Sequence, residues 1–251
     1  MKTLAWWAAI LALGAGTAAA SMNVEEDPSG ETALLTWRHP VPWQVGTVYS
    51  HLVRTVAFAE GERELRGESV DVAIGVSPWA WLLLYGQAGA LFEGRLRGAV
   101  DGEFDPGADG LLGARLNLWQ IYRGVDKTSW RFTVQLAGQY AYRTGADNGA
   151  GTLAWGETLV MLPVNYHLTF ARVIRNVYMG EFQSLGLYAG PAYSRLDGTW
   201  ELGDVERDFE ETRAVGIVGG ADLWLLENLS FGVRADWFDD LSLQLAVRYR
   251  F

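Results

Sequence analysis

The chain of 251 residues has no cysteine, only three histidines, and no run of 18 apolar residues beyond its first twenty positions. Without cysteine, disulfides cannot contribute to its stability. The missing apolar runs and a mean hydropathy of only +0.03 exclude a bundle of membrane-spanning helices. The formal charge of −10, with no basic stripe to neutralise phosphates, excludes a nucleic-acid partner.

Glycine and aromatic residues are abundant instead. The sequence has 30 glycines, 12 tryptophans and 10 tyrosines, and 49% of its residues are hydrophobic. This composition is typical of a β protein with belts of aromatic side chains. The length suits one domain with a core of its own.

The first twenty residues have the pattern of a secretory signal peptide. Lys2 gives a short positive start, Thr3 to Thr17 carry no charge, and Ala18 to Ala20 form a small-residue cleavage site. The alternative is a membrane anchor, but the apolar run is shorter than about 20 residues. Residues 21–43 lack periodicity and are interpreted as a flexible periplasmic segment, with a folded plug as the alternative.

Residues 44–251 repeat one pattern, in which apolar and polar residues alternate and turns separate the runs. The clearest case is 130–143, where Trp130, Phe132 and Val134 begin one face and Arg131, Thr133 and Gln135 begin the other. Fourteen alternating residues exceed the usual globular strand and suit a tilted strand that crosses a bilayer. Similar runs are centred on 45–58, 70–76, 82–95, 112–118, 160–170, 185–194, 215–223, 229–237 and 241–251.

These runs predict an all-β fold, a transmembrane antiparallel up-and-down barrel of about ten strands, with eight as the alternative. An even number of strands returns both chain ends to one side. The expected outer loops are 59–66, 96–107, 144–152, 195–210 and 238–240. The expected inner turns are 77–80, 119–128, 171–180 and 224–228.

Alternation alone does not say which face meets water. A soluble exported sandwich or a lipocalin-like barrel would show the same period. The signal peptide, the strand length, the aromatic residues near strand ends and the glycines of the apolar face together favour a membrane barrel, because a glycine facing lipid leaves no hole in a core.

The last eleven residues carry a resemblance to a known family. Leu241, Leu243, Leu245, Val247, Tyr249 and Phe251 alternate with small or polar residues up to the end of the chain. This stretch resembles the C-terminal strand of small Gram-negative outer-membrane β-barrels, the OmpA/OmpX/Opa-like class. The resemblance implies that Tyr249 and Phe251 form a signal read by the barrel-assembly machinery, with periplasmic chaperones and outer-membrane lipid or lipopolysaccharide as further partners.

The polar face of the strands predicts a network inside the barrel. Its expected members are Asp71, Glu93, Arg115, Arg131, Gln135, Arg143, Asp222, Arg234, Asp236 and Arg248. The arginines Arg131, Arg143, Arg234 and Arg248 are expected to pair with the acids Asp71, Glu93, Asp222 and Asp236. Barrels of eight to ten strands have a lumen largely filled by such side chains.

Signals for chemistry are weak. His39, His51 and His167 have no evident partner in the sequence, and His51 and Arg54 cannot both face the lumen in one register. The acids of 101–109 alternate as in a calcium loop, but Pro106 stands where such a loop needs glycine, so a solvated acidic loop is the interpretation. No catalytic residue, cofactor or resident metal is therefore predicted.

The sequence thus predicts a non-enzymatic outer-membrane barrel with a structural or surface-contact role, or slow passage of small solutes. A narrow porin-like channel is one alternative. A membrane-embedded enzyme of the lipid A deacylase or protease type is the other.

Overall fold

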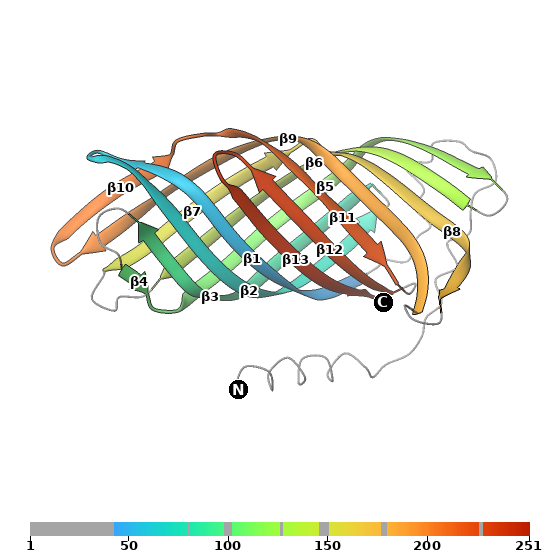
Figure 1. The fold of residues 1–251 in the computed structure, drawn as a ribbon, viewed down its shortest axis with the longest axis horizontal. Coiled ribbons are helices and arrows are strands. Elements are labelled where there is room, and N and C mark those ends of the chain that lie inside the picture. Colours follow the sequence, from blue (N-terminus) through green and yellow to red (C-terminus); the bar gives the residue numbers. More distant parts are fainter. Residues whose placement is uncertain are drawn as a thin grey trace.

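The structure, a computed structural model, describes residues 43–79, 81–97, 102–125, 128–145, 151–176, 180–225 and 228–251. They form one closed antiparallel sheet whose strands tilt across the barrel (Figure 1). No helix among these residues is long and apolar enough to span a membrane. The expected signal peptide 1–20 and nearly all of the expected segment 21–43 lie outside the described residues.

Thirteen β segments make up the sheet. They are β1 (Trp43–Phe58), β2 (Gly61–Trp79), β3 (Leu82–Arg97), β4 (Gly102–Phe104), β5 (Gly107–Val125), β6 (Thr128–Gly145), β7 (Thr152–Met161), β8 (Val164–Asn176), β9 (Gly180–Leu202), β10 (Val205–Glu211), β11 (Val215–Trp224), β12 (Leu229–Trp237) and β13 (Leu241–Arg250).

Three crossings of the barrel are each interrupted once, so the thirteen segments amount to ten crossings. Pro163 has no N–H to give to the ladder, and the chain breaks there into β7 and β8. Breaks at 105–106 and 212–214 likewise divide β4 from β5 and β10 from β11, although 212–214 contains no proline. The prediction of ten strands is confirmed, and eight is wrong.

The ring closes between the first and last strands. β1 pairs with β13 from Gln44 opposite Arg250 to His51 opposite Leu243, and Trp43 and Phe251 exchange backbone hydrogen bonds of 3.2 and 3.0 Å. We call the end of the barrel that holds Trp43 and Phe251 the near end, and the opposite end the far end. The C-terminal strand therefore closes the barrel as well as ending the chain.

The far end closes differently from the rest. The β12–β13 hairpin stops at 238–240, and above it β10 pairs with both β9 and β1, with Val56 opposite Glu211. Thr212 N–H donates to the carbonyl oxygen of Thr55 at 3.1 Å. The tip of β9 and β10 projects at the far end, at the left of Figure 1. At the far end, the closed ring of paired strands therefore runs from β10 directly to β1 and does not include β12 or β13.

Several predicted loops are strand. The expected outer loops 59–66 and 195–210 belong to the β1–β2 and β9–β10 hairpins, whose turns are only 59–60 and 203–204. The expected inner turns 119–128 and 171–180 are also largely strand, since β5 runs to Val125 and β8 to Asn176. The two far-end stretches lack a clear alternation because the faces of the sheet exchange character in the far half. In the two near-end stretches, register shifts between Asn117 and Trp119 and between Thr169 and Ile174 interrupt the alternation.

An apolar band surrounds the outside of the near half. Large side chains such as Ile74, Leu112 and Leu245 point outward, and Leu112 keeps 73% of its surface exposed. Aromatic pairs border this band at the near end, with Trp79 stacked on Trp81 and Trp130 on Tyr166. Tyr49 and Phe92 stack on the far side. An outward apolar band between aromatic girdles is the surface that a bilayer-spanning barrel presents.

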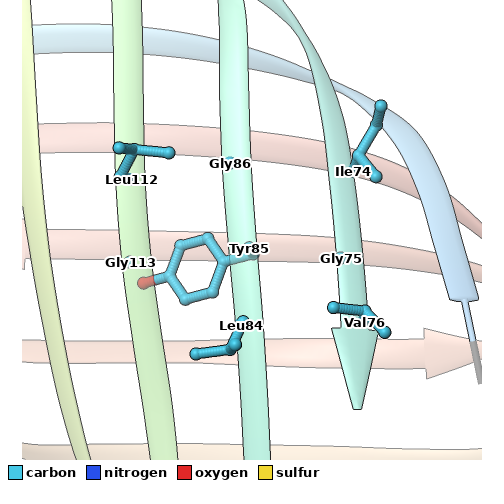
Figure 2. Close-up of a pocket in the computed structure, with 8 residues that line it drawn as sticks. All are labelled: Ile74, Gly75, Val76, Leu84, Tyr85, Gly86, Leu112 and Gly113. Atoms are coloured by element: carbon cyan, nitrogen blue, oxygen red, sulfur yellow. The ribbon is translucent and has the colours of Figure 1, made fainter. Parts of the chain in front are cut away.

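Bulky lumen side chains fold over glycines of the neighbouring strand. Figure 2 shows the Tyr85 ring on β3 directed toward Gly113 of β5, beneath an outward hollow of about 340 Å³ lined by Ile74, Leu84 and Leu112. A Cβ at Gly113 would overlap the Tyr85 ring, and a Cβ at Gly220 would overlap Tyr188. These lumen glycines are needed for close approach of the rings rather than for turns.

Candidate functional site: the barrel interior

The interior of the near half is polar and holds two of the expected ion pairs. Arg234 donates to both carboxylate oxygens of Asp236 at 2.7 Å, and also to the Gln139 side-chain oxygen at 3.2 Å. Arg248 Nη1 lies 3.0 Å from an Asp222 carboxylate oxygen. The first pair is nearly enclosed, whereas the second is about one-third exposed on the arginine side. Water therefore reaches the Arg248 pair more readily.

A cluster of buried charges lies farther along the barrel, where we call Arg54, Asp109, Arg143 and Glu157 the central ion cluster. Glu157 accepts from Arg54 Nη2 at 3.2 Å and from Arg143 Nη1 at 3.4 Å. Arg143 Nε also donates to Asp109 at 3.0 Å. All four side chains are at least nine-tenths buried, so each charge depends on the others for compensation.

Asp71 lies near this cluster but does not form the expected arginine pair. Its carboxylate accepts from the Ser69 hydroxyl at 3.3 Å, and its other oxygen is buried with no hydrogen-bond partner among the described residues. Arg143, one of the four arginines expected to pair with the lumen acids, pairs with Asp109 and Glu157 instead. The expectation that Asp71 pairs with one of the four lumen arginines is wrong. Arg143 is engaged by acids of β5 and β7 because these strands flank β6 in the sheet, whereas β3 and β5 separate β2 from β6.

An apolar core fills the interior beyond the cluster. We call it the far core; its twelve buried members are Leu52, Val56, Phe58, Leu65, Leu91, Leu96, Phe104, Leu153, Trp155, Leu196, Trp200 and Phe209. Trp155 is the largest of the side chains that are almost wholly buried, with 1% exposed. Phe58 packs against Trp200 and Phe209, with ring centres 6.3 and 5.2 Å apart. The far half is therefore packed like a soluble domain.

Glu211 lies at the edge of the far core, at the end of β10. Its Oε1 accepts a hydrogen bond from the Leu196 N–H at 3.0 Å, and its Oε2 is buried with no partner among the described residues. Burial raises the pKa of this carboxyl above its usual value, although the Ser194 hydroxyl, the Leu196 N–H and the charge of Arg54 act in the opposite direction. The neutral form of Glu211 is thus the better fit to its site.

The prediction that Glu93 faces the lumen is wrong. Between Glu68 and Ser69 of β2 the register with β3 shifts, so that Glu68 pairs with Glu93 and Ser69 with Leu91. Phe92 is the extra residue of this β-bulge, and it turns every later side chain of β3 to the other face. Glu93 consequently lies on the outside, 3.8 Å from Arg95.

Arg115, Arg131 and Gln135 continue the lumen side of their strands. Gln135 Nε2 donates to the Asn117 side-chain oxygen at 2.9 Å across β5 and β6. Arg131 lies opposite His167 and is exposed. Arg115 lies on β5, where it interacts electrostatically with the hydroxyl of Tyr85. These three do not join the central ion cluster.

His51 has a partner that sequence reasoning missed. It faces outward on β1, with Nδ1 3.2 Å from Glu68 Oε1, while Arg54 faces the lumen. The hydroxyl of Tyr49 also interacts with Glu68. Across the part of the chain that the structure describes, no three histidine or acidic side chains gather as a metal site.

Asp109, Arg54 and Glu157 are the interior residues that the sequence did not identify. Asp109 was interpreted as part of a solvated acidic loop, but β5 begins at Gly107 and carries it inside. The sequence does contain a signal for this position. Asp109 lies an even number of residues before Gly113 and Arg115, so it belongs to the same face of the strand as they do. Pairing between β1 and β7 across the lumen has no signal in the sequence.

Tyr249 and Phe251 lie on the outward face at the near end. Their rings stack with centres 6.4 Å apart, and Phe251 is exposed. Asn228 donates from its side chain to the Tyr249 hydroxyl at 3.3 Å. This placement leaves the terminal rings accessible, and recognition by the assembly machinery stays a prediction.

Comparisons with known proteins give similarity to outer-membrane β-barrels of solved structure. No family model matches the chain, and no curated protein matches it. The outer membrane protease OmpT of Escherichia coli is 9% identical, with a TM-score of 0.41, over 88% of this chain and 100% of that one. The translocator domain of autotransporter NalP from Neisseria meningitidis is 10% identical, with a TM-score of 0.34, over 85% and 89%.

Ail, the attachment invasion locus protein of Yersinia pestis, is 10% identical, with a TM-score of 0.23, over 84% of this chain and 97% of that one. Likeness at this level carries no inference about activity. The assignment of a closed ten-strand barrel rests on the strand pairing of the chain itself.

Proposed function

We propose that the chain is an outer-membrane barrel with a sealed lumen, whose far half stands out of the bilayer as a surface-contact structure. The far core carries this proposal, because twelve buried apolar side chains occupy the space through which a solute would pass. The central ion cluster lies directly beneath it. A smaller apolar cluster that includes Leu159, Val218 and Phe238 adds a further layer.

The outer surface supports the orientation. Lipid would contact the apolar band, and the far half carries exposed ion pairs outside, such as Arg97 with Glu64 and Arg195 with Asp197. Charged side chains facing hydrocarbon are costly, so the membrane would end below these pairs. In this orientation the near end is periplasmic, where Tyr249 and Phe251 would be read during assembly.

Planar-bilayer recording of the purified protein tests the sealed lumen. We expect no conductance steps above background from the wild-type barrel. The Trp155→Ala, Trp200→Ala double variant empties the centre of the far core, and steps in this variant alone would locate the seal. Steps in the wild-type protein would overturn the proposal and favour a narrow porin-like channel.

The contact role has its own test. The β9–β10 hairpin exposes Glu201, Asp204, Glu206, Asp208 and Glu210, so it fits a cationic surface. Vesicles bearing the barrel should be retained on a polylysine-coated surface at low ionic strength. A variant with these five acids changed to their amides should lose most of that retention, whereas equal retention would overturn the assigned contact surface.

A further inference from the structure

One strand at the far end of the barrel has an edge that no other described strand covers. β10 pairs with β9 along six residues, from Val205 to Glu210, and β9 itself lies between β10 and β7. On its other side β10 pairs with β1 only at Glu210 and Glu211. Among the described residues, the stretch from Val205 to Phe209 therefore has a strand partner on one side alone, where the β9–β10 hairpin projects from the barrel (Figure 1).

The hairpin turn fixes which backbone groups of this edge are free. Leu202 and Val205 lie opposite each other and flank a two-residue turn at 203–204. Residues that flank such a turn bond to each other, and bonded and non-bonded pairs then alternate along an antiparallel ladder. Glu206 and Asp208 thus belong to non-bonded pairs, so their N–H and carbonyl groups point away from β9. These groups are the donors and acceptors of the open edge.

The side chains of the same two residues make this edge acidic. Glu206 and Asp208 are exposed, and Glu206 lies directly opposite Glu201 of β9. Like charges that face each other across a ladder are unfavourable, and a cation beside them would relieve the repulsion. The acids also exclude a second copy of β10 as the partner, because antiparallel self-pairing would bring these carboxylates together. A strand that joins this edge must therefore bring positive charge.

The other face of the hairpin requires uncharged residues from such a strand. Val205 and Leu202 form an exposed apolar pair on this face, with 52% and 38% of their surfaces accessible. Arg207, the next residue of this face, already pairs with Glu60 at 3.1 Å and lies over the Trp200 ring. Since the side chains of a strand alternate between faces, the partner should alternate basic residues with uncharged ones.

We propose that β10 accepts a further strand along this edge, an extended peptide segment in which alternate residues are lysine or arginine. Its backbone bonds to Glu206 and Asp208, as peptides do when they extend a sheet, and its cations lie beside the two carboxylates. Its uncharged residues cover Val205. The inference rests on the proposed contact role and deepens it, because it gives the cationic partner a strand conformation and a defined place.

Fluorescence anisotropy of labelled synthetic peptides, titrated with the purified full-length barrel, tests the strand conformation. In both peptides lysine alternates with threonine, and in the second peptide the lysine amides are N-methylated. In antiparallel pairing the lysines opposite Glu206 and Asp208 bond through their own backbone, so methylation removes these donors and keeps the charge. The N-methylated peptide should bind at least about tenfold more weakly, because carbonyl groups of the edge lose their partners.

Two variants of the barrel test the place. Glu206→Pro and Glu206→Gln remove the same charge, but only proline also removes the N–H that points to the open edge. Proline is tolerated in an edge strand where the N–H faces solvent, so the pairing of β9 with β10 stays. The unmethylated peptide should bind Glu206→Pro at least about tenfold more weakly than Glu206→Gln. Heat-modifiable gel migration checks that both variants are folded.

Weaker binding of the N-methylated peptide to the parent supports strand addition, and weaker binding to Glu206→Pro than to Glu206→Gln supports its place on β10. Equal affinity of the two peptides, or of the two variants, would overturn the inference. It would leave the contact role intact as long as the barrel is retained on polylysine. If neither peptide binds, the inference fails, and the contact role fails with it only when polylysine retention is lost as well.

Discussion

The two halves of the barrel place apolar and polar side chains on opposite faces. In the near half Ile74 and Leu245 point outward and Arg234 points inward, whereas in the far half Trp155 points inward and Arg195 points outward. The same strands run through both halves, so secondary structure does not distinguish them. In the orientation proposed above, the medium outside distinguishes them, since lipid accepts an apolar surface and water does not.

The change between the halves occurs without a break in most strands. In β3 the bulge at Phe92 exchanges the faces directly. In β1 the same face points inward along the whole strand. Only the residue types on that face change, from Gln44 at the near end to Arg54 in the middle and Phe58 at the far end. A bilayer-spanning barrel and a soluble-like barrel are therefore joined along one sheet, with the central ion cluster at the junction.

The sharpest test of this comparison removes the largest side chain of the far core. Trp155→Ala should lower the free energy of unfolding by about 3–5 kcal/mol, because it leaves a cavity in a packed interior. The outward Leu112→Ala change should cost far less, since Leu112 is 73% exposed and lipid fills the gap. Urea unfolding of both variants in vesicles measures the difference. Equal losses would mean that the far core is not packed as described.

A second test leaves the central ion cluster with too few acids. Glu157→Gln removes the carboxylate that Arg54 and Arg143 share, so we expect a loss of about 3 kcal/mol in the free energy of unfolding. Asp222→Asn removes the partner of the more exposed Arg248 and should cost much less. If the two substitutions cost the same, the distinction between the buried cluster and the near lumen fails.

A third test places a charge on the outside of each half. Ile74 and Val205 have similar exposure, 54% and 52%, but the first lies in the apolar band and the second in the β9–β10 hairpin. Ile74→Arg should destabilise the barrel in vesicles by roughly 2–4 kcal/mol, as a charge facing hydrocarbon does. Val205→Arg should have almost no effect. The reverse order would place the membrane around the far half.

The smallest expected effect concerns pH. Because burial raises the pKa of Glu211 in the folded protein, the folded state binds its proton more tightly than the unfolded state does. Its contribution is therefore fully present below the unfolded pKa of about 4.3 and is lost as pH rises through the folded value. The stability of Glu211→Gln relative to wild type should accordingly increase over that rise. A difference that does not change with pH, in unfolding curves at several pH values, would contradict the assigned burial.

Much of the near half could be predicted from the sequence. The alternation of 130–143 and 241–251 sets which side chains face outward, because a strand has a period of two. The pairs Arg234–Asp236 and Arg248–Asp222 were also within reach, since Arg234 and Asp236 are two residues apart on one strand. Period and proximity are local properties, and local properties can be read along a chain.

The far half could not be predicted in this way. Glu201 to Glu211 look like a solvated loop because their outward residues are charged, yet Phe209 of the same stretch is buried in the far core. Likewise, the outward turn of Glu93 depends on one extra residue in β3, and a bulge has no reliable signal in a single strand. An expectation of one polar lumen from end to end therefore misjudged both stretches.

The sequence by itself determined that this chain forms a barrel of antiparallel strands that ends on an outward aromatic side chain. Tertiary structure alone decided that Arg54 of β1, Arg143 of β6 and Glu157 of β7 meet in the middle of the lumen. It also decided that β10 closes the far ring against β1. Strand tilt and ring closure set these contacts, and both are properties of the whole sheet, so no single strand encodes them.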